Sequence, residues 1–417
     1  MQERPQKASQ TTPAPTTRVL SIDVLRGITI AFMILVNDPG DWSHVYAQLD
    51  HAKWNGWTLT DLVFPNFLFL VGAAIILSLN ARLRRGDSRR MLALHIVRRA
   101  AILFALKMFL SAYPYFHMTH LRIYGVLTRI AICYLVAGFI CLLTQRARNL
   151  LAISAALLVG YWALMRFVPV PGFGIPTHEI PLLDPDRNLA AWLDRGVNAF
   201  FQRTIHTGVL YEHTRDPEGL LSTIPAVATT LLGSVAALWL RWKKDHPNPT
   251  VRAWVPEIDS MVTTAVLVLS GAFCLAASQL WNFWFPINKN LWTSSYVLFA
   301  AGCSLLGLAA CYWLIDVKRL HETRAGKWLT WPWLVFGSNA IAVYSISILI
   351  VKTMLWIKVP SGLGDGKTIT AWFWVYHNIF ARHHSSEVTS LAFGLAFVAV
   401  CLIPNWLLWR KRIFIKI

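Results

Sequence analysis

The sequence predicts an all-α, polytopic integral membrane protein, a bundle of about ten transmembrane helices with both termini in the cytoplasm. Of its 417 residues, 55% are hydrophobic and only 14% are charged, a composition typical of membrane proteins. Ten apolar stretches are each long enough to cross a hydrocarbon core of about 30 Å. The 20 Trp residues agree with this class, because Trp favours the membrane–water interface.

The apolar stretches define the elements in chain order. The spans are expected at residues 19–37, 60–81, 92–112, 122–144, 149–168, 219–241, 261–284, 291–315, 331–356 and 388–409. Residues 1–18 are polar, which predicts a disordered cytoplasmic tail rather than a signal peptide. Residues 19–417 are predicted to form a single transmembrane domain. Its long external connections, about 38–59, 169–218 and 357–387, are either functional loops or plain surface connectors.

The distribution of positive charge predicts the orientation. The net charge is +18, and Lys and Arg gather in alternate connections and near both ends of the chain, for example at 82–90, 241–244 and 410–412. The positive-inside rule therefore places both termini in the cytoplasm. No nucleic-acid-binding motif accompanies the charge, so a nucleic-acid partner is not expected. All six cysteines fall inside predicted spans without zinc-ligand company, so no metal site is predicted either.

Charged residues in a spanning helix are costly and usually face the protein interior. Asp23 and Arg26 are three residues apart, so they are expected to form an ion pair on one helix face. Arg122 and Arg129 are seven apart and are expected to share a face of one span, where they pair with acids or bind a phosphate or carboxylate. Asn339 is expected near the middle of a span, either as a bond between helices or as part of a site.

The first external connection is the densest polar cluster. It holds Asn37, His51 and Asn55, and Asp61 follows at the start of the next span. Histidine titrates near neutral pH and can carry a proton or an acyl group. The sequence therefore predicts His51 as a catalytic residue, with Asn37 and Asp61 beside it; a structural interfacial histidine is the alternative.

Six short motifs carry a family resemblance. They lie at residues 21–27, 49–58, 61–65, 125–130, 216–224 and 286–293. Together they resemble the heparan-α-glucosaminide N-acetyltransferase family and its bacterial relatives. The resemblance implies a transmembrane enzyme that uses cytosolic acetyl-CoA to acetylate an amino sugar on the other side of the membrane. The family's active histidine matches His51, its nearby asparagine matches Asn37, and its Asp-Pro-Glu-Gly acids match Asp216 and Glu218.

The resemblance also implies two sets of binding residues, with acetyl-CoA as donor substrate and no metal. The acceptor amino sugar is expected to contact Asp50, Asn55, Asp216, Glu218, Asn288, Lys289 and Asn290. The anionic donor is expected to contact Arg26, Arg84, Arg85, Arg98, Arg99, Arg129 and Asn339.

The chain begins 18 residues before its first span, without the long lumenal domain of the lysosomal enzyme. A multi-pass protein of a bacterial inner membrane, acting on a glucosamine-type amino sugar, is therefore expected. His51 would either take the amine proton during direct transfer or first become acetylated itself. A homodimer would fit the family. The competing hypothesis is a membrane transporter for amino sugars or N-acetylglucosamine-related compounds.

Overall fold

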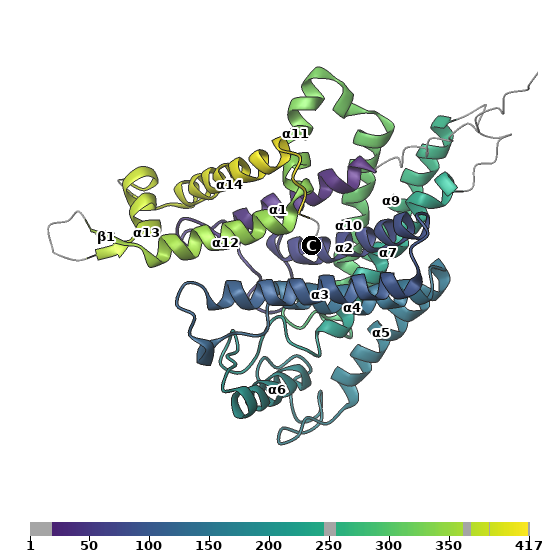
Figure 1. The fold of residues 1–417 in the computed structure, drawn as a ribbon. Coiled ribbons are helices and arrows are strands. Elements are labelled where there is room, and N and C mark those ends of the chain that lie inside the picture. The colour runs from purple at the N-terminus through teal and green to yellow at the C-terminus, as the bar shows by residue number, and fades with distance from the viewer. Residues whose placement is uncertain (1–18, 246–255, 362–367, 383, 416–417) are drawn as a thin grey trace, which may run out of the picture.

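The fold is a bundle of long helices, seen in Figure 1. The computed structural model describes residues 19–245, 256–361, 368–382 and 384–415. The predicted tail 1–18, the glycines of 362–366 and His383 lie outside the described residues.

Each predicted span corresponds to helical structure. The helices are α1 (Leu20–Asn37), α2 (Val63–Leu83), α3 (Arg89–Ala112), α4 (Val126–Leu143), α5 (Ala147–Phe167), α7 (Thr223–Asp245), α9 (Pro256–Asn282), α10 (Ser294–Cys311), α11 (Arg324–Ser338), α12 (Ala340–Trp356) and α14 (Glu387–Arg410). In the described part of the chain, eight helices are long and apolar enough to cross a membrane, or nine if a bent pair counts as one span. The tenth predicted span is α3, whose basic side chains lower its hydropathy. This is a multi-pass, all-α membrane protein.

One predicted span is broken. The sequence predicts a continuous helix over 331–356, which is wrong, because α11 and α12 meet at an angle of 81°. Asn339 lies at the junction with φ −134° and ψ 45°, outside helical geometry. Hydropathy detects a break of this kind poorly, because both halves remain apolar.

The start of α4 also differs from the prediction. Gly125 has a φ of 140° and precedes the first helical residue, Val126. A Cβ at Gly125 would lie 2.5 Å from the Lys107 side chain, so a larger residue fits poorly. Arg122 is therefore in the loop before α4, and the expectation that it shares a helix face with Arg129 is wrong.

Glycines allow α2 and α7 to approach closely. A Cβ on Gly72 would lie 1.7 Å from the carbonyl oxygen of Thr230, and one on Gly233 would lie 1.8 Å from that of Phe69. Ser234 donates a hydrogen bond of 2.9 Å to the Gly72 carbonyl across the same contact. Small residues of this kind are how membrane helices gain contact area without a hydrophobic driving force. The contact fixes α2, which carries polar groups at both of its ends.

The external connections contain short elements of their own. The 169–218 connection includes α6 (Leu189–Ile205), which lies apart from the long helices at the bottom of Figure 1. In the 357–387 connection, β1 (Lys358–Pro360) pairs antiparallel with β2 (Thr368–Thr370), and α13 (Ala371–Val375) follows. Single helical turns cover Thr60–Leu62, Met118–His120 and Leu320–Glu322, and π-helical turns cover Tyr312–Val317 and Tyr376–Phe380.

Candidate active site

The centre of the site is a hydrogen-bonded histidine–carboxylate pair. His51 Nδ1 lies 2.6 Å from Asp61 Oδ1. Asp61, in the turn that precedes α2, has a fully buried side chain, whereas the His51 side chain is 42% exposed. A carboxylate that accepts from Nδ1–H holds the imidazole in one tautomer and leaves the other nitrogen available for chemistry. The exposed ring can therefore meet a substrate.

The second oxygen of Asp61 is fixed by the loop itself. Oδ2 accepts hydrogen bonds of 3.1 Å from the Ala52 amide, the Thr58 amide and the Thr58 hydroxyl. The Tyr296 hydroxyl donates to the Asp61 carbonyl from α10. The carboxylate therefore orients His51 from a rigid position.

The loop that carries His51 is tied to the connection before α10. Gly56 donates its amide to the Ile287 carbonyl at 2.8 Å, and Asn288 Nδ2 donates to Asn55 Oδ1 at 3.1 Å. Asn288 is fully buried, and its Oδ1 accepts from the Leu291 amide. Of the predicted acceptor residues, Asn55 and Asn288 therefore serve to hold the two connections together.

Two other residues predicted near His51, Asn37 and Asp50, are exposed. Asn37 is the last residue of α1, and its side chain is exposed. Asp50 is also exposed, and its Oδ1 accepts a hydrogen bond of 2.7 Å from the His51 amide. Lys289 carries the positive charge that faces both Asp61 and Glu218.

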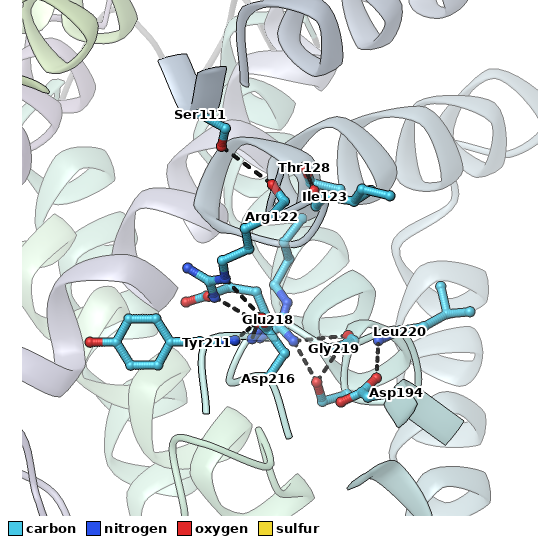
Figure 2. Close-up of polar contacts among 12 residues, drawn as sticks. Ser111, Arg122, Ile123, Thr128, Asp194, Tyr211, Asp216, Glu218, Gly219 and Leu220 are labelled. Carbon is cyan, nitrogen blue, oxygen red and sulfur yellow. Dashed lines mark hydrogen bonds and ion pairs between the residues drawn. The ribbon is translucent and has the colours of Figure 1, made fainter. Parts of the chain in front are cut away.

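A second group of charges surrounds Arg122 (Figure 2). Its Nε and Nη2 donate to the two oxygens of Asp216 at 2.8 and 2.6 Å, and Nη2 also binds Glu218. Asp216 accepts two further bonds from the amides of Tyr211 and Glu218. Burial opposes ionisation of Glu218, but the Arg122 and Lys289 charges hold its pKa below the ordinary value. Asp216 is thus saturated by protein donors.

Arg129 lies deeper and is fully buried. Its Nη2 donates to the Gly219 carbonyl at 3.1 Å and to the Ser222 hydroxyl, and the guanidinium lies 4.9 Å from the Trp292 ring centre. Its Nε and Nη1 have no hydrogen-bond partner among the described residues. Among the described ion pairs, none includes Arg129. A buried cation with free donors can bind an anionic or carbonyl group of a ligand.

Asp194 in α6 was not predicted, because its segment was expected to be irregular. It is 2% exposed and accepts a hydrogen bond of 3.0 Å from the Leu220 amide (Figure 2). Burial, with a contribution from Asp216, raises its pKa to about 7. It lines a small hollow together with Lys53, Trp54, Asn290 and Tyr211. The amphipathic pattern of residues 189–205 could have predicted the helix that carries Asp194.

At the other end of the bundle, a cavity of about 800 Å³ opens among α1 to α4, α11 and α12. Its basic lining residues are Arg26, Arg82, Arg85, His95 and Arg99, and its apolar ones include Phe67, Leu70, Leu103 and Ile130. We call this space the basic cavity. Of the residues predicted to bind the donor, Arg84, Arg98, Arg129 and Asn339 do not line it.

Several of the basic side chains have partners on the protein. Arg26 donates to Asp23 at 2.6 Å, as the spacing predicted, and to the Gly337 carbonyl at 2.8 Å. Arg82 pairs with Asp87 at 2.6 Å. Arg99 contacts Tyr134 through its hydroxyl and ring. Sequence reasoning missed Arg82 and His95, although the one-turn spacing of His95 and Arg99 was a usable signal.

The basic cavity extends along α2 toward the His51–Asp61 pair. Its lining runs from Arg82 to Phe67, about 22 Å at 1.5 Å per residue. Phe67 is the fifth residue of α2, and Asp61 lies in the turn just before this helix. The basic and apolar parts of the lining therefore follow one another along α2, and the turn that holds Asp61, the partner of His51, precedes it.

Comparison with known proteins identifies the family of the chain. A family model described as heparan-alpha-glucosaminide N-acetyltransferase, catalytic, matches residues 18–193. The chain belongs to the heparan-alpha-glucosaminide N-acetyltransferase family. It is 30% identical to the Mus musculus protein of that name over 80% of this chain, and 29% identical to the Homo sapiens protein over 96% of it.

The chain spans 54% and 60% of the lengths of these two N-acetyltransferases. The part matched by the family model contains His51, Asp61, Arg129 and the basic lining of the cavity, whereas Asp216 and Asn288 lie beyond it.

Proposed function

We propose that this protein is a transmembrane acyltransferase that moves an acetyl group from acetyl-CoA to the amine of a glucosamine-type sugar. The proposal is supported chiefly by the basic cavity, whose apolar inner end approaches the partner of His51. The names of the relatives supply the reaction class and the amino-sugar acceptor. We further infer a bacterial inner membrane, with the cavity open to the cytoplasm.

The donor fits the lining of the cavity. CoA carries phosphates at one end and an uncharged pantetheine arm at the other. Arg85 and Arg99 are suited to the phosphates, because guanidinium groups bind phosphate oxygens in a fixed geometry. Phe67, Leu70 and Ile130 would accept the arm and direct the thioester toward His51. No metal is required for this transfer.

The His51–Asp61 pair then serves acyl transfer. With Nδ1–H held by Asp61, Nε2 carries the free lone pair. In direct transfer, Nε2 accepts the proton of the attacking amine while the C–S bond breaks and the thiolate of CoA leaves. In two-step transfer, Nε2 attacks the thioester and the thiolate of CoA leaves. The amine then attacks the acetyl-imidazole, the bond from the acetyl carbon to Nε2 breaks, and the amine proton passes to solvent. Asn37 or Asn290 would donate to the oxyanion in either route.

The acceptor would approach from the side of the exposed His51 face. A small hollow is lined by Lys53 and Trp54, which follow His51 closely in the chain, and by Asn290 from the connection before α10. It offers an aromatic surface and polar groups to a sugar. Asp216 also lines this hollow, but Arg122 already binds both of its oxygens, and Arg122 binds Glu218 as well.

A transporter is the second candidate, and the broken α11–α12 pair favours it. Discontinuous helices at membrane depth are typical of transporter binding sites. A transporter would carry an amino sugar across vesicles without releasing CoA.

The test uses purified full-length protein with acetyl-CoA and glucosamine, following free thiol and acetylated sugar. We expect stoichiometric thiol and product from the wild type, and a loss of about a thousandfold or more in His51→Ala. His178→Ala, an exposed histidine of another connection, is the matched control and should retain activity. Full transfer by folded His51→Ala would contradict the catalytic role, and sugar flux without thiol would favour the transporter.

A further inference from the structure

We propose that Phe414 and Ile415, in a chain segment held in place by Asn339, form a wall of the basic cavity that contacts the donor. Asn339 is then a positioning residue for donor binding, and Phe414 and Ile415 are contact residues. This inference rests on the proposed function, because it takes the ligand of the cavity to be a CoA thioester.

The chain reverses direction after α14. Arg412 has a φ of 56°, in the left-handed region, and its amide donates to the Trp409 carbonyl at 3.0 Å. The Ile413 amide donates to the Leu408 carbonyl at 2.9 Å. These bonds end the helix and turn the following residues back toward the bundle.

Asn339 holds the returning segment at two points. Its Nδ2 donates to the Ile413 carbonyl at 3.0 Å, and its Oδ1 accepts from the Ile415 amide at 2.7 Å. Asn339 is 1% exposed and lies at the junction of α11 and α12. The side-chain amide therefore bonds to the backbone of the returning segment much as a neighbouring β-strand would. These two bonds explain why a polar residue lies at the junction of α11 and α12.

The held segment lines the same space as the basic side chains. Phe414 and Ile415 line the cavity together with Gly337 and Ala340, which flank the junction. Arg26, on the opposite side of the junction, donates to the Gly337 carbonyl at 2.8 Å. The helix break, the returning segment and the basic lining are therefore one structural unit.

The exposed apolar surface indicates what the wall contacts. Phe414 is 41% exposed and Ile415 is 42% exposed, although both face a cavity rather than the outer surface alone. The uncharged pantetheine arm of CoA, a chain of alkyl and amide groups, would cover them while the phosphates of CoA meet the arginines. Burial of apolar surface by the ligand would then add to donor affinity.

The experiment is a double-mutant cycle on full-length protein, with CoA itself as the probe in equilibrium binding. The first variant is Asn339→Ala, and the second combines Phe414→Ala with Ile415→Ala. Asn339→Ala should weaken CoA binding about tenfold, because the returning segment loses both hydrogen bonds that hold it against the cavity. The Phe414/Ile415 variant should weaken it by a similar factor, and all three changes together by no more than either set alone.

Ile413→Ala is the matched control. Ile413 does not line the cavity, and its carbonyl and amide remain after the substitution. It should bind CoA like the wild type. Its turnover at saturating acetyl-CoA should also equal the wild-type value. A merely structural role of Asn339 would lower the Tm of Asn339→Ala without changing its CoA affinity.

Unchanged CoA affinity in Asn339→Ala, or strictly additive losses in the combined variant, would overturn the inference. Wild-type CoA affinity in the Phe414/Ile415 variant would also overturn it. Both side chains are partly exposed, so this variant should still fold. A wild-type protein that binds CoA but transfers no acetyl group would overturn the proposed function while leaving the wall intact. A wild type that binds no CoA would overturn both.

Discussion

Two carboxylates near the His51 end of the bundle have opposite surroundings. Asp61 binds one exposed imidazole and three donors from its own loop, so its partner keeps a free nitrogen that faces solvent. Asp216 binds Arg122 at two points, and two backbone amides complete its shell. Both acids are buried and both were predicted as site residues. The comparison teaches that a buried acid is a candidate for the active site when its partner still has a free nitrogen that can bind a substrate.

Replacing Asp61 should have the largest effect on activity. In Asp61→Asn the amide can no longer fix the His51 tautomer as a carboxylate does, so kcat should fall about a hundredfold or more. The Tm should change far less than activity, which is measured by thiol release at saturating acetyl-CoA. Wild-type turnover in this variant would place Asp61 with Asp216 as a structural acid.

Replacing Asp216 should instead damage stability. Asp216→Asn leaves Arg122 with a weaker partner in a buried pair, and it should lower the free energy of unfolding by roughly 3 kcal/mol. Activity per folded molecule should stay within a few-fold of the wild type. Thermal unfolding in detergent, followed alongside turnover, distinguishes the two acids; a large loss of kcat with an unchanged Tm would break the comparison.

The same contrast between used and available groups applies in the basic cavity. Arg85 lines it and Arg84 does not, although the two are adjacent in sequence. Arg85→Ala should raise the KM for acetyl-CoA about tenfold, since a charge-assisted contact to phosphate contributes roughly 1.5 kcal/mol. Arg84→Ala should leave the KM near the wild-type value. Equal effects in both variants would indicate general attraction rather than a defined site.

Asp194 should give the smallest effect, visible in the pH dependence of stability. Its folded pKa, about 7, lies above the ordinary value of 3.8, so the folded state binds the proton more tightly than the unfolded state. The associated stability is complete below about pH 4 and is lost as the pH rises through 7. The wild-type Tm should therefore fall by a few degrees relative to Asp194→Asn between pH 5 and 8. Parallel Tm curves would contradict this assignment.

The sequence alone determined the membrane class, the approximate positions of the spanning helices and the connection that carries His51. These features depend on local properties of the sequence. The length of an apolar run decides whether it can cross a membrane, and the polar residues between two runs mark a connection. The Asp23–Arg26 pair was predicted correctly for the same reason, because three residues on a helix fix the geometry.

Only the tertiary structure decided which polar residues meet. Arg122 and Asp216 are separated by 94 positions in the chain, and Asn339 and Ile413 by 74. The break at Asn339 and the late start of α4, after Gly125, depend on backbone geometry that hydropathy does not report. Asp216 and Asp61 look alike in sequence because each is an acid at a helix start. Their difference arises from the partners that the fold brings to them across the bundle.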